Sequence, residues 1–363
     1  MTGVRARGEE VRRFIIACVG EHPRDISRVV SQKFGISRQA VNLHLKRLVS
    51  EGALEAKGAT NNRTYALAPL LSWRQVYFIA EQPTEDRVWY RDIAPHIGSV
   101  PQNVSDIWHY GFTEMFNNAL EHSEGTAVAV DLEKTAAGTD LTISDDGVGI
   151  FRKIQAALGL EDARHSVLEL AKGKFTTDPA HHSGEGIFFS SRMFDEFVVL
   201  SGEVFFAHAF PSVEDWILER ERSVIGTLVS MNLSNHTART TKKVFDRFTT
   251  GDDDYGFTKT VVPVDLARYG DDKLVSRSQA RRLLARVDRF RTVVLDFQGV
   301  DAIGQAFADE VFRVFPSLHP EVKVAETNAR SAVKRMISRA RSASQESTNS
   351  PTPESEGDQM SLL

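Results

Sequence analysis

The chain is 363 residues long, 41% of them hydrophobic, and its formal net charge is −5 at pH 7. This length predicts two or three domains, and the apolar content is enough for several packed cores. No apolar run approaches the roughly 20 residues of a membrane span, and the first residues lack an apolar signal region, so we expect a cytoplasmic protein with no membrane contact. The single cysteine, Cys18, cannot form an internal disulfide and is expected to be a buried thiol.

The charge is unevenly distributed along the chain. Residues 1–70 hold 12 lysines and arginines against 6 aspartates and glutamates, a surplus of 6 positive charges, so the remaining residues carry −11. A basic N-terminal segment on an acidic body indicates that any binding of nucleic acid belongs to the first 70 residues.

This basic segment predicts three helices followed by two strands. Apolar residues recur at helical spacing in three stretches, and Asp25 and Ser37 are placed to cap the second and third helices. Gly52 is expected to end the third helix. The predicted elements are helices over 9–19, 26–34 and 38–50 and strands over 54–57 and 64–67.

The order of these elements is similar to the winged helix-turn-helix domain of bacterial transcription regulators, which binds double-stranded DNA. The resemblance implies that residues 1–70 form such a domain, with the third helix at the base edges and the loop between the strands as the wing. A winged helix that binds protein through a solvated basic face is the alternative. The residues expected at the DNA are Arg38, Gln39, Asn42, His44, Lys46 and Arg63.

Residues 71–100 are expected to connect this domain to the next one. Three tryptophans in and after the segment, Trp73, Trp89 and Trp108, are more typical of core anchors between two domains than of side chains that stack on a ligand.

A carboxylate and an amide follow at helical spacing. Glu114 and Asn118 are four residues apart in a predicted helix, so both face one cleft. A carboxylate there can accept a proton, and an amide oxygen can bind Mg²⁺.

Two glycine motifs come next in the chain. Asp145 follows a predicted strand and begins the pattern Asp-x-Gly-x-Gly with Gly147 and Gly149, where a carboxylate can accept from an exocyclic amine and glycine lets the backbone approach a planar base. Gly184 and Gly186 precede a predicted helix whose N-terminal amides suit a phosphate.

The motifs in this order resemble the ATPase fold shared by gyrase, heat-shock chaperones, histidine kinases and MutL. The resemblance covers about residues 85–235 and is closest to the anti-sigma-factor serine kinases, whose motif also runs Glu-x-x-x-Asn-Ala-x-x-His. It implies that residues 101–236 form an α/β sandwich that binds ATP and Mg²⁺. Glu114 would be the general base, Asn118 the Mg²⁺ ligand and Asp145 the adenine reader. The other residues implied at the nucleotide are His122, Gly147, Gly149, Lys174, Gly184, Gly186 and Thr227.

The connection between the two glycine motifs, residues 151–183, is long and is expected to form a lid over the nucleotide. Lys172 and Lys174 could meet the phosphates or be solvated. His181 and His182 are adjacent, and adjacent histidines rarely bind one metal ion. Because no Cys/His cluster has the spacing of a zinc site, we expect no metal other than the nucleotide's Mg²⁺.

Residues 244–341 predict a small α/β module. We expect strands over 260–266 and 292–297, a helix over 276–287, and a further helix after Gly304. From residue 342 onward the composition is that of a disordered tail.

The run from Val293 through Glu310 resembles a STAS-like domain, the fold of anti-sigma-factor antagonists. In those antagonists an Asp-Ser-Ser tripeptide follows the strand, and a kinase partner phosphorylates its second serine. The matching residues here are Gly304, Gln305 and Ala306, which offer no hydroxyl group. The resemblance therefore implies a module that the chain does not phosphorylate at this loop.

The sequence thus predicts a multi-domain α/β protein with a winged helix, a histidine-kinase-like ATPase domain, a STAS-like domain and a disordered tail. The favoured function is an ATP-responsive DNA-binding transcription regulator, expected as a homodimer, with a protein partner at the STAS-like domain as a further expectation. Two alternatives stay open: a serine kinase acting on a separate STAS-type partner, and a chaperone-like ATPase that clamps its subunits.

Overall fold

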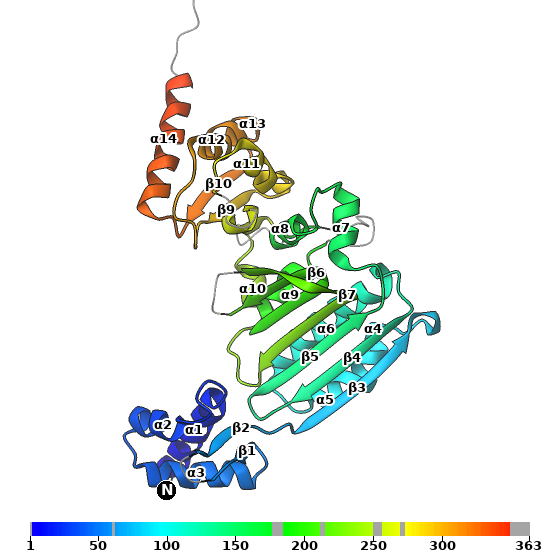
Figure 1. Cartoon of the computed structure of the whole chain (residues 1–363), viewed down its shortest axis with the longest axis vertical. Coiled ribbons are helices and arrows are strands. Elements are labelled where there is room, and N and C mark those ends of the chain that lie inside the picture. Colours follow the sequence, from blue (N-terminus) through cyan, green and yellow to red (C-terminus); the bar gives the residue numbers. More distant parts are fainter. Residues whose placement is uncertain are drawn as a thin grey trace, which may run out of the picture. The chain divides into compact units, whose positions relative to one another are not determined.

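The structure is a computed structural model that describes residues 2–59, 62–175, 184–210, 215–249, 256–268 and 273–348. The chain divides into two units, Met1–Arg247 and Phe248–Leu363, and each is described by itself. The fold is mixed α/β (Figure 1). Among the described residues, the strands form sheets of two, five and three strands.

Three helices and a two-stranded sheet form the N-terminal segment, as the sequence predicts. Their apolar faces share one core, in which Ile15, Val30 and Leu45 are fully buried. The two strands are antiparallel, with Leu54 opposite Leu67. The elements are α1 (Thr2–Cys18), α2 (Ile26–Phe34), α3 (Arg38–Ser50), β1 (Leu54–Lys57) and β2 (Thr64–Leu67).

Only one of the two predicted helix caps forms. The Ser37 hydroxyl accepts a hydrogen bond from the Ala40 amide and caps α3. Asp25 precedes α2 but accepts no capping bond there, because Arg28 in the first turn donates to its carboxylate at 2.5 Å. The prediction for Cys18 is also corrected, since the thiol is half-buried at the end of α1.

The larger sheet belongs to the first unit and is antiparallel throughout. Its strand order is β3-β4-β5-β7-β6. Residues 71–78, which the sequence analysis assigns to a connector, are the edge strand β3, because their side chains alternate and Tyr77 is buried against Phe116. The strands are β3 (Leu71–Phe78), β4 (Ala127–Lys134), β5 (Gly138–Asp145), β6 (Glu196–Ala209) and β7 (Asp215–Ser234).

Helices cover one face of this sheet, with α6 across its centre (Figure 1). Gly111 of α6 lies so close to Phe194, just before β6, that a Cβ on this glycine would collide with the phenylalanine ring. The helical elements are α4 (Glu85–Val88), a π-helical turn (Trp89–Ile93), α5 (Ala94–Ile97), α6 (Gln102–His122), α7 (Ile150–Leu158), α8 (His165–Lys172), α9 (Gly186–Met193) and α10 (Thr241–Asp246).

The three tryptophans that the sequence analysis expects between two domains all lie within this sheet and its helices. Trp108 is fully buried against Phe194, with ring centroids 4.9 Å apart, and Trp89 is buried beside Phe112. Trp73 is half-buried on the ring of His96. Trp73 lies on β3, Trp89 in the π-helical turn and Trp108 in α6, so all three belong to the sheet and the helices that cover it.

α10 also belongs to the first unit. The ring of Phe245 packs 4.5 Å from that of Phe189 and 5.5 Å from that of Tyr110. The units therefore divide after Arg247, a few residues later than the predicted start of the C-terminal module at 244.

The second unit has a parallel three-stranded sheet in the order β10-β9-β8. Leu295 and Phe297 from the middle of the sheet and Phe307 from the helix that follows it are fully buried. The elements are β8 (Lys259–Pro263), α11 (Arg277–Leu284), β9 (Thr292–Asp296), α12 (Gln305–Asp309), a π-helical turn (Glu310–Val314), α13 (Phe315–Leu318), β10 (Lys323–Thr327) and α14 (Ser331–Thr348).

Three predicted boundaries in this unit are corrected. The first strand ends at Pro263 and continues as a 3-10 turn, because proline lacks the amide that the ladder needs. The first helix is shorter than expected and ends at Leu284. α14 continues to Thr348, so the first seven residues of the predicted disordered tail, 342–348, are helical, and Val333, Ile337 and Ala340 anchor its apolar face.

Candidate functional site

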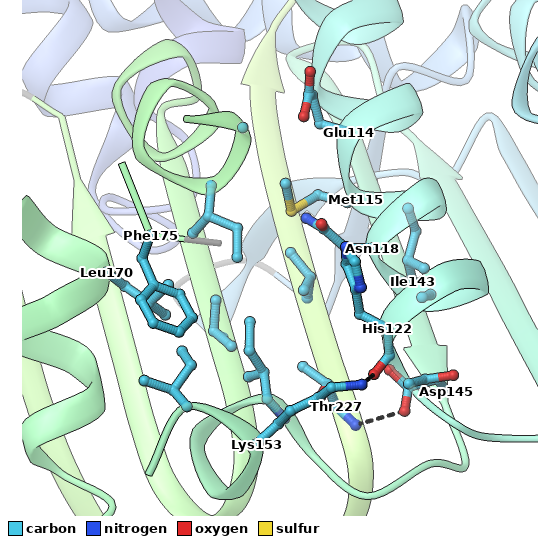
Figure 2. A pocket seen from close by; sticks show the side chains of 18 of the residues that line it. Glu114, Met115, Asn118, His122, Ile143, Asp145, Lys153, Leu170, Phe175 and Thr227 are labelled. Atoms are coloured by element: carbon cyan, nitrogen blue, oxygen red, sulfur yellow. Dashed lines mark hydrogen bonds between the residues drawn. The ribbon is translucent and has the colours of Figure 1, made fainter. Parts of the chain in front are cut away.

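A cavity of about 310 Å³ opens between α6, the end of β5, α7 and the residues around the second glycine pair (Figure 2). Three of the predicted residues, Glu114, Asn118 and His122, follow one another along the cavity side of α6, because each is one helical turn from the next. Asp145, Gly184, Gly186 and Thr227 also line it. Residues that are far apart in the sequence are thus brought together.

Asp145 is held in place by two backbone amides. Its Oδ1 accepts hydrogen bonds from the Gly147 amide at 2.9 Å and the Thr227 amide at 3.2 Å. Among the described residues, no hydrogen-bond donor reaches its other oxygen, Oδ2. Burial raises the pKa of Asp145 above the usual value of an aspartate. The result is a fixed carboxylate with one acceptor oxygen available to the cavity.

The glycines of the first motif shape the loop that carries this carboxylate. A Cβ on Gly147 would collide with the Ser123 carbonyl, and Gly149 has a φ of +89°. Neither residue is among those that line the cavity, and both shape the loop that carries Asp145. Thr227 supports the same loop, because its hydroxyl accepts from the Ile150 amide at 3.0 Å.

The neighbouring Asp146, to which the sequence analysis gives no role, fastens the loop from the other side. Its carboxylate accepts from the Thr126 and Ala127 amides at 2.6 and 3.0 Å and from the Thr126 hydroxyl. These hydrogen bonds lower the pKa of Asp146 to about 2, and the bond from the Thr126 hydroxyl has the largest effect. The signal in the sequence that could have pointed to Asp146 is that two aspartates are adjacent at the start of the glycine motif.

Two carboxylates line the cavity on the side away from Asp145. Glu114 lies against Gly186, where a Cβ would collide with its carboxylate oxygen, so only glycine leaves room for it. Glu185, which the sequence analysis does not single out, lies between the paired glycines and lines the same end. Burial raises the pKa of Glu185. Burial also raises the pKa of Tyr110, and the charges of both glutamates add to that rise.

The two lysines considered for phosphate contact do not line the cavity. Lys172 is buried at the end of α8, where its Nζ donates to Glu169 at 2.7 Å. Lys174 lies close enough to Glu185 for its positive charge to oppose the rise in the pKa of that carboxyl group. The last part of the predicted lid, residues 176–183 with His181 and His182, lies outside the described residues.

Among the residues that the structure describes, Lys153 on α7 is the lysine that lines the cavity. Its Nζ donates to the His122 carbonyl at 2.7 Å and to Glu124 at 2.8 Å, which ties α7 to the end of α6. Leu170 and Phe175 form an apolar wall across the cavity (Figure 2). The sequence analysis misses Lys153 because it interprets residues 151–183 as a lid. The helical spacing of Ile150 and Ile154 is the signal that could have indicated α7 and its lysine.

The predicted metal chemistry rests on few groups. Among residues 2–59, 62–175, 184–210, 215–249, 256–268 and 273–348, no group of three His, Cys, Asp or Glu side chains could hold a metal ion. A metal ion in the cavity would therefore need oxygen ligands from a bound small molecule as well as from the protein.

A second candidate surface lies on α3 of the N-terminal segment. Arg38, Gln39, Asn42 and Lys46 are exposed on it, as predicted. Asn42 is oriented by Ser27, whose hydroxyl donates to its Oδ1 at 3.0 Å. On the strand pair, exposed Arg63 lies over the ring of Tyr65, 5.5 Å from its centroid.

His44 differs from this group. It is half-buried and lies beside Gly8 of α1, so its ring faces the neighbouring helix. Burial lowers the pKa of His44, and the charges of Arg12 and Arg47 lower it further. His44 is thus less accessible than Arg38, Gln39, Asn42 and Lys46, because it lies beside α1.

Comparison with known families gives an assignment for part of the chain. Residues 279–334 match a family described as a STAS-like domain of unknown function (DUF4325), which confirms the STAS-like prediction for the C-terminal module. No curated protein matches the chain. Within the described parts of the chain, none of the helices combines the length and apolar content that crossing a membrane requires.

Proposed function

We propose that the chain is an ATP-binding and DNA-binding transcription regulator, in which the nucleotide state of the central sheet-and-helix part controls the N-terminal helices. The observation that carries the proposal is the cavity itself. One wall presents Glu114 and Asn118, the far end presents Asp145, and Gly186 stands where a side chain would exclude the carboxylate. The same three motifs support a resemblance to the histidine-kinase-like ATPases.

The end of the cavity at Asp145 suits an adenine. A fixed carboxylate oxygen that accepts from none of the described residues can accept a hydrogen bond from the exocyclic amine of adenine, which guanine does not offer at that position. Ile143, Ile154 and Val229 supply apolar contact for a flat ring. Thr227 adds a hydroxyl beside the same edge.

The end at Glu114 suits the phosphates. Bound ATP with Mg²⁺ would supply the transferable phosphoryl group and the charge that activates it. The Asn118 amide oxygen would bind the cation, since Asn118 lines the cavity, and the amides at the start of α9 would favour anionic groups. Glu114 is the base that would take a proton from the attacking hydroxyl or water.

The N-terminal helices suit double-stranded DNA. The segment has a surplus of 6 positive charges, and α3 exposes Arg38, Gln39 and Lys46 on one side. Arg, Gln and Asn are side chains that read base edges in the major groove, and a basic strand pair suits the neighbouring phosphates.

A serine kinase acting on a separate STAS-type partner is the second candidate. The match over 279–334 favours it in one respect, since the chain carries a domain of the same general type as such partners. Its own loop at Gly304, Gln305 and Ala306 lacks a hydroxyl group, so the target would have to be another protein.

A DNA titration tests the favoured proposal. Purified full-length protein is titrated with duplex DNA in the presence of ATP, ADP or no nucleotide, each at two salt concentrations. We expect salt-dependent binding whose affinity changes with the nucleotide, and no nucleotide effect for Asp145→Asn. Duplex binding that ignores nucleotide, or no salt-dependent binding at all, would contradict the regulator and favour the kinase.

A further inference from the structure

The exposed side of α3 contains one apolar side chain among polar ones. Gln39, Asn42, Leu43 and Lys46 are all exposed and follow helical spacing, so they form one ridge along the helix, which we call the α3 ridge. Leu43 is 68% exposed, whereas Leu45 and Leu48 of the same helix are buried in the core. Leu43 thus contributes nothing to the core, and the sequence analysis assigns it no role.

We propose that Leu43 contacts the 5-methyl group of a thymine in the major groove of double-stranded DNA. The inference rests on the proposed DNA-binding function and adds to it a preference for a particular base. Thymine is the only ordinary DNA base that presents a methyl group in the major groove, and apolar side chains are the groups that read it.

The surroundings of Leu43 favour DNA over an apolar protein partner. Lys46 lies on the same ridge as the leucine, and the whole segment has its surplus of 6 positive charges, whereas neighbouring Arg47 is paired with Glu51 at 2.7 Å. Gln39 and Asn42 on the α3 ridge can donate and accept toward base edges. An apolar protein surface would leave these polar groups unpaired, whereas a base-pair edge satisfies them beside the methyl contact.

The test removes the leucine and the methyl group separately. Full-length protein first enriches duplexes from a randomised pool, and each thymine of the enriched duplex is then replaced in turn by deoxyuridine. This change removes the 5-methyl group and keeps the hydrogen-bonding edge. Wild-type protein should lose about fourfold in affinity at one or two positions, the value of one buried methyl group.

The variant Leu43→Ala should bind the thymine duplex about fourfold more weakly and show no further loss at those positions with deoxyuridine. Leu318→Ala is the matched control, because Leu318 is 70% exposed in the other unit, and it should bind like wild type. Equal melting temperatures for wild type and both variants would show that the folds are intact.

Three results would overturn the inference while leaving DNA binding in place: an unchanged affinity of Leu43→Ala, an equal loss on deoxyuridine substitution in wild type and Leu43→Ala, or enriched duplexes without thymine. An apolar protein contact at Leu43 would give the first of these. If wild-type protein shows no salt-dependent duplex binding, the proposed DNA-binding function fails together with this contact.

Discussion

At the scale of single residues, the cavity separates two carboxylates with different surroundings. Asp145 is fixed by two amides beside apolar walls, and Glu114 shares its end of the cavity with Glu185. The first suits recognition of a neutral donor, and the second suits proton transfer. Their roles can be tested one side chain at a time.

Asp145→Asn should lower ATP affinity about 10- to 100-fold, because an amide replaces a charged acceptor. Burial raises the pKa of Asp145 above the ordinary value of about 3.9. Wild-type affinity should therefore start to fall on acidification at a higher pH than an ordinary aspartate would allow, since protonation removes the acceptor. Calorimetric titration across pH checks this. Protonation of ATP itself affects wild type and variant equally, so it cancels in the ratio of the two affinities. A ratio that does not change with pH would contradict the role of Asp145 as an acceptor.

Glu114→Gln and Asn118→Ala should separate hydrolysis from binding. Without its base, Glu114→Gln should bind ATP normally and hydrolyse it about 100-fold more slowly or worse, whereas Asn118→Ala should weaken binding of ATP with Mg²⁺. Phosphate release and equilibrium binding measure the two effects. Normal turnover by Glu114→Gln would exclude Glu114 as the base.

At the scale of elements, the site depends on how loops are fastened to the sheet. Asp146 joins the loop after β5 to the start of β4, and Lys153 joins α7 to the end of α6. Both fastenings lie beside Asp145, so the recognition end of the cavity is built by contacts between elements that are distant in sequence.

Asp146→Asn should make the protein less sensitive to acid. Hydrogen bonds hold the folded pKa of Asp146 at about 2, below the unfolded value of about 3.9. Its contribution to stability is therefore complete above the unfolded pKa and is lost as the pH falls from about 4 to about 2. Urea unfolding midpoints should fall less steeply over this range in the variant, which starts from a lower stability at neutral pH.

Glu133→Gln is the control for this experiment, since it removes an exposed carboxylate from β4. It should keep the wild-type slope. Parallel acid profiles for wild type and Asp146→Asn would show that the carboxylate does not contribute in this way.

At the scale of the whole molecule, the proposal requires that three parts act on one another. The N-terminal helices carry the basic surface, the central sheet carries the cavity, and the C-terminal unit matches a STAS-like family. Because the loop at Gly304 has no hydroxyl group, a contribution of this unit to regulation would have to come from packing.

Phe307→Ala should unfold or loosen the C-terminal unit, since this fully buried ring is worth about 3–5 kcal/mol to its core. We expect ATP binding to survive and the effect of ATP on DNA affinity to disappear. Leu318→Ala, exposed in the same unit, should keep both. Unchanged coupling with the unit demonstrably unfolded, or stoichiometric phosphate on this unit after incubation with labelled ATP, would contradict regulation by packing.

The sequence alone determined the order of elements in the N-terminal segment and the STAS-like character of the C-terminal module. Helical periodicity and the flanking turn residues placed α3, β1 and β2 at their observed bounds. It also selected Glu114, Asn118 and Asp145, whose spacing is local and visible in the chain.

Only the tertiary structure decided which neighbours those residues have. It made residues 71–78 an edge strand, placed His44 beside α1, and kept Lys172 with Glu169 away from the cavity. It also brought Lys153 and Glu185 to the cavity. The physical reason is that burial, hydrogen bonding and charge depend on contacts between distant segments, whereas a sequence pattern reports only which face of a segment is apolar.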